Sequence, residues 1–502
     1  MAITEQQVRS VVERVVSRLL EDGEKPAGAA PAGEAGENGQ HAAGDRAVVT
    51  GVAAGGGAPA AGGVLFTEMD RLIDAAGHAQ AQLVSMTLEQ RKRIIQSIRD
   101  VLIRNLDALC RMAVEETGLG NCRDKDAKNR LAALKTPGVE DIEPVAYTDD
   151  AGLTLVERAP YGVIGAVTPC TNPTETLICN SIGMVAGGNA VVFNPHPAAK
   201  ETSRFTVSLF NQAVQDAGGP PELLAAMSEP TIQSAQAMMK HPGINLLVVT
   251  GGPGVVKEAM RSEKKVIAAG PGNPPVVVDE TADIDQAGRD IVLGAGLDNN
   301  IVCICEKEIL AVGSIADSLK ESLKKHGAYE LNSSQTDRIT ELVIQDPGRP
   351  GHEGAPNKKY VGKDAAVIAE AIGIQVSPQT RILLCEVDAD HPLVWTEQLM
   401  PVIPLVRMNS ADEAIAFAVR CEHGFRHTAS IHSKNIDRLS HMAKVMNCSV
   451  FVKNGPNYAG LGYGGAGFPS YTIASPTGEG LTRARTFTRE RRCTLVGSFR
   501  IV

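Results

Sequence analysis

Apolar and polar positions from residue 64 onward follow two periods, one helical and one typical of buried strands. Residues 66–117 place apolar side chains at helical spacing, which predicts helix. Short continuous apolar runs follow between further helical stretches, at residues 162–167, 189–193, 244–250, 264–270 and 274–279. Because a strand buried on both faces forms a continuous apolar run, this pattern predicts an α/β fold with parallel sheets covered by helices.

Two segments have a different pattern, in which apolar and polar residues alternate along the chain. Residues 152–158 and 493–502 are therefore predicted to be antiparallel edge strands. An edge strand leaves backbone groups unpaired, and these groups often pair with another subunit. We therefore expect a homo-oligomer, either a dimer or a tetramer.

The N-terminal segment is predicted to be a separate unit. Valines and leucines in residues 3–22 fall on one face of a helix, and charged or polar side chains fall on the other. Residues 24–63 are rich in Ala, Gly and Pro, which predicts a flexible linker. A helix on such a tether is predicted to dock into a groove on a partner protein, and the alternative is a helix that folds back on its own domain.

Composition and charge narrow the classes of protein. A chain of 502 residues suggests two or three domains. The net charge of −9 argues against a nucleic-acid partner, and no apolar run is long enough to span a membrane. Charged residues interrupt the first apolar runs, which is unlike a signal peptide. The ten cysteines include no CxxC pair, so they indicate neither a disulfide scaffold nor a zinc site.

The candidate nucleophile is Cys303. It follows the Asp-Asn-Asn sequence at 298–300, which predicts a turn, and precedes the strand-like residues 306–312. Loop positions at strand ends are where α/β proteins usually carry catalytic groups. Cys305 would face the same way if the segment is extended. The alternative for any one of these thiols is an inert, buried side chain.

Three other segments carry candidate groups. Asn172 lies in a Pro-bracketed turn after a predicted strand and could donate to an oxyanion; the alternative is an ordinary turn before a proline. Thr250, Gly251 and Gly252 join a strand to a helix, and such a helix start can face a ligand. Glu397 precedes an apolar, Pro-rich strand and could accept hydrogen bonds from ribose hydroxyls, although a surface carboxylate is the usual alternative.

In this order, these segments resemble the aldehyde dehydrogenase superfamily over residues 64–502. The motifs are Asn299-Asn300-x-x-Cys303, the Thr250 to Gly254 turn, the Glu397 to Pro401 segment and residues 462–482. They are most similar to the CoA-acylating propionaldehyde and acetaldehyde dehydrogenases of bacterial microcompartments. The resemblance implies an aldehyde dehydrogenase-like α/β fold with a Rossmann-type cofactor domain, an α/β catalytic domain and a small β oligomerisation element.

The resemblance also implies boundaries and roles. Expected segments are an encapsulation helix (1–23), a linker (24–63), a cofactor domain (64–145 and 159–268), a catalytic domain (269–484) and oligomerisation strands (146–158 and 485–502). Cys303 is implied as the catalytic thiol and Asn172 as the oxyanion amide. The implied cofactor cleft contains Thr168, Pro169, Asn194, His196, Thr250, Gly251, Gly252 and Glu397. Superfamily members usually carry a lysine at Asn194-Pro195-His196, so NAD is expected and NADP stays open.

Ala268 departs from the pattern of the hydrolytic members of the superfamily at a position that matters for the chemistry. Hydrolytic members of the superfamily carry a glutamate two positions before the glycine that Gly270 matches, and that glutamate activates water. Without this base, a thioester on Cys303 should persist until another thiol attacks, and a thiol needs less help from a base than water does.

The expected function is oxidation of a short-chain aldehyde with NAD+ and coenzyme A to an acyl-CoA, inside a microcompartment lumen. Residues 3–22 are expected to bind a shell or core protein, and neither a nucleic acid nor a membrane is expected as partner. One alternative is a hydrolytic, semialdehyde-type dehydrogenase that releases the free acid. A second is a non-catalytic shell-docking protein. Neither the aldehyde chain length nor the CoA contacts can be read from the sequence.

Overall fold

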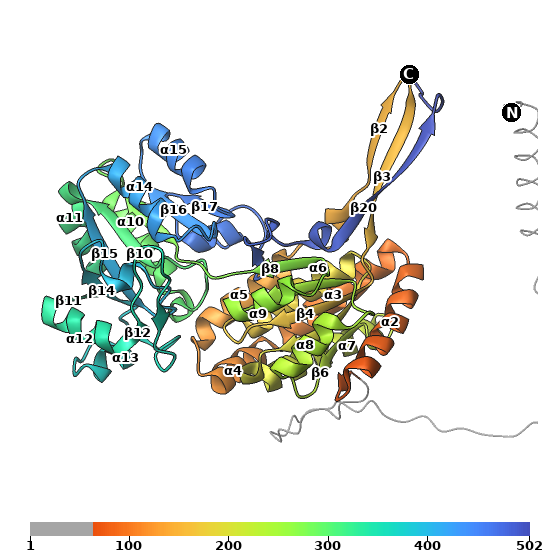
Figure 1. Cartoon of the computed structure of the whole chain (residues 1–502), viewed down its shortest axis with the longest axis horizontal. Helices are drawn as coiled ribbons and strands as arrows, with labels where there is room; N and C mark the ends of the chain where they lie inside the picture. Colours follow the sequence, from red (N-terminus) through yellow and green to blue (C-terminus); the bar gives the residue numbers. More distant parts are fainter. Residues whose placement is uncertain (1–63) are drawn as a thin grey trace, which may run out of the picture. The chain divides into compact units, whose positions relative to one another are not determined.

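The computed structural model describes residues 64–502 (Figure 1). The docking helix and the linker expected in residues 1–63 therefore lie outside the described residues. Among the described helices, none has both the length and the apolar character needed to cross a membrane.

The predicted helical stretch at 66–117 forms three helices after a short strand. They are α2 (Met69–Ser85), α3 (Leu88–Arg104) and α4 (Leu106–Thr117). Helix α3 begins where Thr87 and Gln90 exchange side-chain and backbone hydrogen bonds, which satisfies two amide groups that a helix start leaves free. Its apolar face is buried through Ile94, Ile98 and Leu102, as the spacing predicts.

The first sheet has six parallel strands in the order β1-β6-β5-β4-β7-β8. In chain order these strands are β1 (Leu65–Phe66), β4 (Val163–Thr168), β5 (Ala190–Pro195), β6 (Leu224–Met227), β7 (Leu246–Thr250) and β8 (Val266–Ala269). The remaining helices of this part are α5 (Cys122–Lys135), α6 (Pro173–Ala186), α7 (Lys200–Asp216), α8 (Ile232–Lys240) and α9 (Pro253–Met260). Every residue of β4 and β5 is buried, which explains their unbroken apolar runs.

The second sheet has seven parallel strands in the order β11-β14-β15-β10-β9-β16-β17. The strands are β9 (Pro275–Val278), β10 (Glu308–Val312), β11 (Ala328–Leu331), β14 (Ile382–Glu386), β15 (Val402–Met408), β16 (Thr428–His432) and β17 (Val450–Lys453). The accompanying helices are α10 (Ile284–Ala295), α11 (Gly313–Lys325), α12 (Ser333–Val343), α13 (Ala365–Ala371), α14 (Ala411–Cys421) and α15 (Ile436–Met446).

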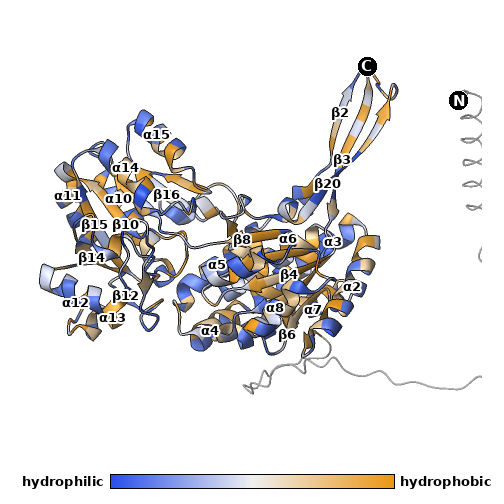
Figure 2. Ribbon diagram, in the orientation of Figure 1, coloured by the Kyte–Doolittle hydropathy of each residue, from blue (hydrophilic) through white to orange (hydrophobic). Residues whose placement is uncertain are grey.

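Strand β9 shows why this second sheet needs helices on both faces. Val277 packs in one apolar core with Ala414 of α14, whereas its neighbour Val276 packs in a different core with Ile291 of α10. Successive side chains of a strand point to opposite faces, so both faces of the sheet are buried. Figure 2 shows the hydrophobic colour concentrated on the strands and the hydrophilic colour on the outer helices. The predicted α/β class with parallel sheets is confirmed.

A third sheet is antiparallel and contains both predicted edge strands. It has the order β2-β3-β20, with β2 (Val145–Asp149), β3 (Gly152–Pro160) and β20 (Thr488–Val496). The sequence placed the last strand at 493–502, but it begins five residues earlier and pairs with β3 from Thr488 to Val496. The two predicted strands thus pair with each other. The alternation pattern did not predict β2, whose residues all face solvent, although the resemblance placed residues 146–158 among the oligomerisation strands.

Candidate active site

Cys303 lies in a tight turn between α10 and β10. Asp298, Asn299 and Asn300 all have left-handed backbone angles, with φ of 47°, 57° and 65°. Asn and Asp adopt this conformation at lower cost than other residues with a side chain, which explains why the turn is built from them. The segment that follows is not extended, so the expectation that both thiols face one way is wrong: Cys305 is fully buried, and Cys303 is partly exposed.

Side-chain amides hold this turn in place. The Asn299 amide donates to the backbone oxygen of Gly362 at 3.0 Å and to Oδ1 of Asp364 at 2.9 Å. The Asn300 amide donates to the backbone oxygens on either side of the turn, at Ala295 and Glu306. These bonds hold the nucleophile's loop against both flanking segments, as a preorganised site requires.

Asn172 is the residue immediately before helix α6. Its side chain makes no capping bond to that helix, so the alternative of an ordinary turn-forming asparagine does not hold. Instead, its Oδ1 accepts a hydrogen bond of 2.6 Å from Nζ of Lys128 on α5. Asn172 is 6 % exposed, so its amide is largely shielded from water, and the bond from Lys128 fixes its orientation.

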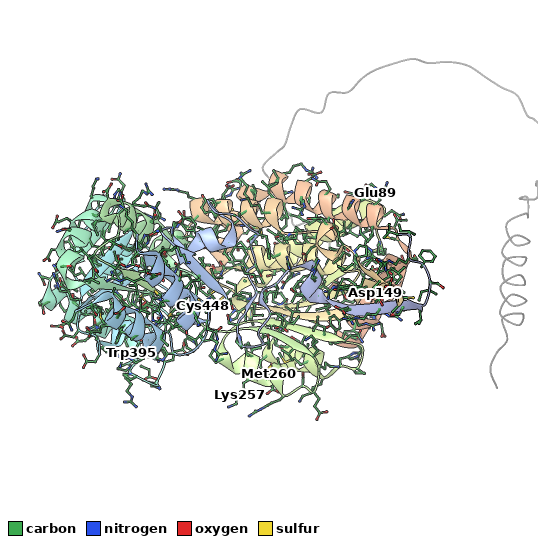
Figure 3. All side chains as sticks on the ribbon, turned by 90° about the horizontal axis from the view of Figure 1, so that it is seen from above. Glu89, Asp149, Lys257, Met260, Trp395 and Cys448 are labelled. Atoms are coloured by element: carbon green, nitrogen blue, oxygen red, sulfur yellow. The ribbon has the colours of Figure 1, made fainter. Side chains whose placement is uncertain are left out.

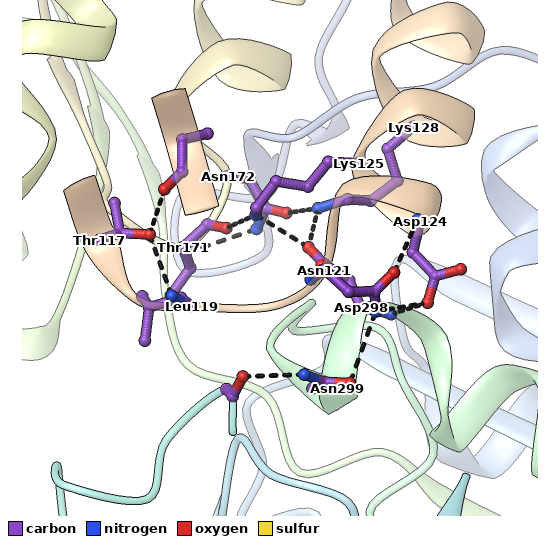
Figure 4. Close-up of polar contacts among 12 residues, drawn as sticks. Thr117, Leu119, Asn121, Asp124, Lys125, Lys128, Thr171, Asn172, Asp298 and Asn299 are labelled. Carbon is purple, nitrogen blue, oxygen red and sulfur yellow. Dashed lines mark hydrogen bonds and ion pairs between the residues drawn. The ribbon is translucent and has the colours of Figure 1, made fainter. Parts of the chain in front are cut away.

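Lys128 belongs to a buried network of charges that the sequence reasoning missed (Figure 4). Its Nζ lies 2.6 Å from Oδ2 of Asp298 and 3.0 Å from Oε1 of Glu175. Lys125 lies 3.0 Å from the same Asp298 oxygen. The available signal was on α5, where Asp124, Lys125 and Lys128 share one helix face that an ordinary amphipathic helix would make apolar.

The surroundings of Cys303 favour the neutral thiol. Burial and the nearby carboxylate of Glu397 raise the pKa of Cys303 to about 12. Burial likewise raises the pKa of Glu397 to about 7, while its Oε1 accepts the backbone N–H of Gly272 at 3.4 Å. A side chain at Gly272 would come within 3.0 Å of the Cys303 carbonyl oxygen and 2.9 Å of the His427 ring, so glycine permits this close approach.

His427 is a second residue near the thiol that the sequence reasoning missed. It is fully buried, and burial together with Lys307 lowers its pKa to about 3, so the ring is neutral at physiological pH. Its Nδ1 lies 2.8 Å from Oγ1 of Thr428. Its Nε2 has no hydrogen-bond partner within residues 64–502.

Seven of the eight predicted cofactor residues gather at one edge of the first sheet, whereas Glu397 lies before β15 and accepts from the Gly272 backbone. Thr168 ends β4, Asn194 and His196 lie at the end of β5, and Thr250 ends β7. Since β4 pairs in parallel with both neighbours, the carboxyl ends of the three strands meet. This edge, where the sheet order reverses direction, is where open α/β sheets bind ligands.

The groups at this edge differ in whether another side chain already occupies their hydrogen-bonding atoms. The buried Thr168 hydroxyl has no hydrogen-bond partner in the described part of the chain, and His196 is exposed. A side chain at Gly252 would meet nothing within 4 Å. By contrast, Asn194 already accepts from the Ser234 hydroxyl at 2.6 Å, and Thr250 lies 2.7 Å from the Thr472 hydroxyl. A free donor and an open glycine turn fit a nucleotide.

The glycine turn leads into α9, which borders this edge. Pro169 and Gly251 are partly exposed, and Gly252 precedes the first residue of α9. The first backbone N–H groups of a helix are unpaired and favour anionic groups such as a pyrophosphate. Lys257 and Met260 project from the outer side of this helix (Figure 3), and Met260 is 56 % exposed.

Ala268 lies in the middle of β8, next to the glycine turn. It is completely buried, its neighbour across the ladder is Val249, and its backbone N–H donates to the Thr477 hydroxyl at 3.1 Å. A methyl group fills this position, so it supplies no group that could activate water.

The fold and the site define the class of this protein. Residues 66–468 match the aldehyde dehydrogenase family, and the chain belongs to that family.

The comparisons are more specific than the family. The chain is 48 % identical over 439 residues to the acetaldehyde dehydrogenase (acetylating) EutE of Salmonella typhimurium, covering 87 % of this chain and 93 % of that protein. It is 49 % identical, with a TM-score of 0.84, to propionaldehyde dehydrogenase of Rhodopseudomonas palustris, solved with bound CoA and an acylated cysteine (86 % and 98 % covered). The propionaldehyde dehydrogenase of the Clostridium phytofermentans fucose utilisation microcompartment is also 49 % identical, with a TM-score of 0.84. This match covers 87 % of the present chain and 99 % of that one.

Proposed function

We propose that this chain is a CoA-acylating aldehyde dehydrogenase that converts a short-chain aldehyde, such as acetaldehyde or propionaldehyde, to its acyl-CoA with NAD+. The observation that carries the proposal is that one lysine, Lys128, contacts both the Asn172 amide and Asp298, the first residue of the turn that leads to the partly exposed Cys303. The relatives named for acetylating and propionaldehyde-oxidising activity support it.

The first half of the reaction forms a thioester on Cys303. Its sulfur adds to the aldehyde carbonyl, and the thiol proton passes to solvent. The negative oxygen that develops is held by the Asn172 amide and by a backbone N–H at Cys303. Thr168, Pro169, His196, Gly251, Gly252 and Glu397 would hold a nicotinamide cofactor, which would supply the acceptor for the hydride. The carbonyl then reforms as a thioester.

The second half transfers the acyl group to coenzyme A. The CoA thiol attacks the thioester, its proton is released, acyl-CoA leaves and the Cys303 thiol is regenerated. The buried methyl of Ala268 supports this route over hydrolysis, because no carboxylate stands there to activate water. The hydrolytic alternative predicts free acid without CoA, and a panel of C2–C4 aldehydes with and without CoA separates the two.

The preferred cofactor is proposed to be NAD+. His196 occupies the region where family members usually carry a lysine. The residue is exposed, but partial desolvation of the ring and the nearby Lys358 lower its pKa, so it carries little charge at neutral pH. A neutral group there offers little attraction for the extra phosphate of NADP+. The kcat/KM values for NAD+ and NADP+ test this directly, and a preference for NADP+ contradicts it.

The domain assignment follows from the sheets. We assign residues 64–145 and 159–268 to the cofactor domain and 269–484 to the catalytic domain. Residues 146–158 and 485–502 are proposed to join subunits into a dimer or tetramer, because the third sheet leaves apolar side chains exposed on β2 and β20.

We propose that the enzyme works inside a microcompartment and is recruited through residues 3–22, which bind a shell or core protein. The microcompartment origin of a relative and the amphipathic pattern support this. A reporter fused to residues 1–23 should concentrate in the compartment, and a diffuse reporter contradicts it. Dehydrogenase activity after deletion of residues 1–23 separates catalysis from docking and tests the alternative of a non-catalytic docking protein.

A further inference from the structure

We propose that Lys128 is a positioning residue, which fixes the direction of the Asn172 amide so that its NH2 group faces the oxygen of the reacting carbonyl. This inference rests on the proposed function. Lys128 need not touch the substrate in this role, since it acts through Asn172.

The chemistry of the two groups determines the orientation. An ammonium group has only donors, so the atom of the Asn172 amide that lies 2.6 Å from Nζ of Lys128 must be the oxygen. The NH2 group must therefore point away from Lys128. Within residues 64–502 this NH2 group makes a single long hydrogen bond, of 3.4 Å, to the Thr171 hydroxyl, so donor capacity is left for another acceptor.

Lys128 also connects this amide to the turn that carries the nucleophile. Its second partner at 2.6 Å is Asp298, the first residue of the left-handed turn that leads to Cys303. Its Nζ lies 5.8 Å from the centre of the Tyr471 ring, and Lys128 is only 3 % exposed. A narrow apolar pocket is lined by Lys128 together with Val302, the neighbour of Cys303. One cation thus holds the donor and the nucleophile's loop in fixed relation (Figure 4).

The charge balance favours positioning over a direct electrostatic role. Lys125 and Lys128 face the two buried carboxylates of Asp298 and Glu175, so the cluster of these four groups is neutral. The positive charge of Lys128 is therefore already compensated when an oxyanion forms nearby. What remains specific to Lys128 is its bond to the amide oxygen.

Lys125 provides a matched control. It is fully buried on the same helix and pairs with the same Asp298 oxygen at 3.0 Å. Its Nζ also donates to the backbone oxygen of Thr171 at 3.5 Å, and among the described residues it makes no hydrogen bond to the Asn172 amide. Removing Lys125 perturbs the charge network without removing the bond that directs the amide.

The test is a double-mutant cycle on the burst of NADH that accompanies formation of the thioester. Loss of one oxyanion donor slows acyl-transfer chemistry by roughly 10²–10³-fold, and we expect Lys128→Met to slow the burst by a similar factor. In an Asn172→Ala background, Lys128→Met should cost less than about threefold, because the group through which it acts is gone. Lys125→Met should slow the burst less and show no such coupling to Asn172. Alkylation of Cys303 by iodoacetamide should change only a few-fold in Lys128→Met.

The inference would be overturned if the reductions in burst rate caused by Lys128→Met and Asn172→Ala multiply in the double variant. It would also be overturned if Lys125→Met and Lys128→Met show the same coupling to Asn172→Ala. If Lys128→Met does not fold, the variant Asn172→Asp tests the inference instead. A carboxylate there would face Lys128 and keep the fold but remove the donor, so a retained Tm with a lost burst is expected. A large fall in Tm, or a retained burst, would contradict the assigned contact. Absence of CoA-dependent turnover in the unmodified enzyme would instead refute the proposed function.

Discussion

The carboxylate of Glu397 lies close enough to the thiol of Cys303 to raise its pKa, and burial acts in the same direction. With a pKa of about 12, the thiol is stored protonated at physiological pH. This arrangement protects the nucleophile from oxidation and alkylation between turnovers, since the thiolate is the reactive form.

Glu397→Gln should lower the pKa of Cys303, because it removes a negative charge that disfavours the thiolate. The alkylation rate of the free enzyme should rise with pH up to at least about pH 10 without a plateau. The variant should react faster above about pH 7, where Glu397 is ionised. Iodoacetamide kinetics with mass spectrometry of the labelled cysteine measure this, and Cys303→Ala gives the background from the other thiols. A slower reaction in Glu397→Gln would contradict the assigned interaction.

Asn299→Ala should destabilise the fold by about 2 kcal/mol, because it removes three side-chain hydrogen bonds, two donated and a long one accepted from Asn121, and puts alanine in a left-handed conformation. Asn299→Gly loses the same bonds but adopts the left-handed conformation without strain. Its loss of unfolding free energy should therefore be about 1 kcal/mol smaller than that of Asn299→Ala. Urea unfolding compares the two variants. Equal losses of unfolding free energy would show that the backbone conformation contributes nothing.

Glu306→Gln should stabilise the protein increasingly as the pH rises. Burial raises the pKa of Glu306 to about 8, whereas an unfolded glutamate titrates near 4.3. Between these values the folded state must bind a proton that the unfolded state has lost, so this group costs stability as pH rises from about 4.3 and the cost levels off above about 8. Glutamine carries no such cost and can keep the bond from the Asn457 backbone N–H to Oε1.

The measurement for Glu306 is the difference in unfolding free energy between variant and parent from pH 5 to pH 9. It should grow by up to about 1.4 kcal/mol per pH unit and level off above about pH 8. Glu140→Gln, which changes an exposed carboxylate, is the control. A difference that does not vary with pH would contradict the raised pKa.

The third sheet makes a prediction about assembly. Leu495 is 46 % and Val496 is 78 % exposed at the end of β20, and a covered apolar surface there would stabilise an oligomer. The double change Leu495→Asp and Val496→Asp should lower the mass measured by light scattering. Ile232→Asp, on an isoleucine that is 72 % exposed at the start of α8, should leave the mass unchanged. The proposal fails if both variants keep the parent mass.

The pattern of apolar residues predicts a strand well where all of its side chains are buried. The strands β4, β5, β7, β8 and β9 all fall within predicted apolar runs to within a few residues. Strand β2 was missed because none of its side chains is buried, so no pattern of burial is imposed on its residues.

The candidate site could be predicted only in part. Cys303 and Asn172 stood in recognisable motifs, but the contacts that hold them come from α5, more than forty residues earlier in the chain. The charged face of α5 marks this helix as unusual, but it does not by itself show that Lys128 is buried, because a lysine on a helix is usually solvated. Its importance depends on where α5 packs, which periodicity does not report.

The central claim is that the acyl group on Cys303 waits for coenzyme A, and a single rapid-mixing experiment tests it most directly. Without CoA, propionaldehyde and NAD+ should give a burst of about one NADH per active site and then almost no further turnover or free propionate. Adding CoA should start continuous turnover with propionyl-CoA as product. Sustained NADH formation with stoichiometric propionate in the absence of CoA would contradict the account.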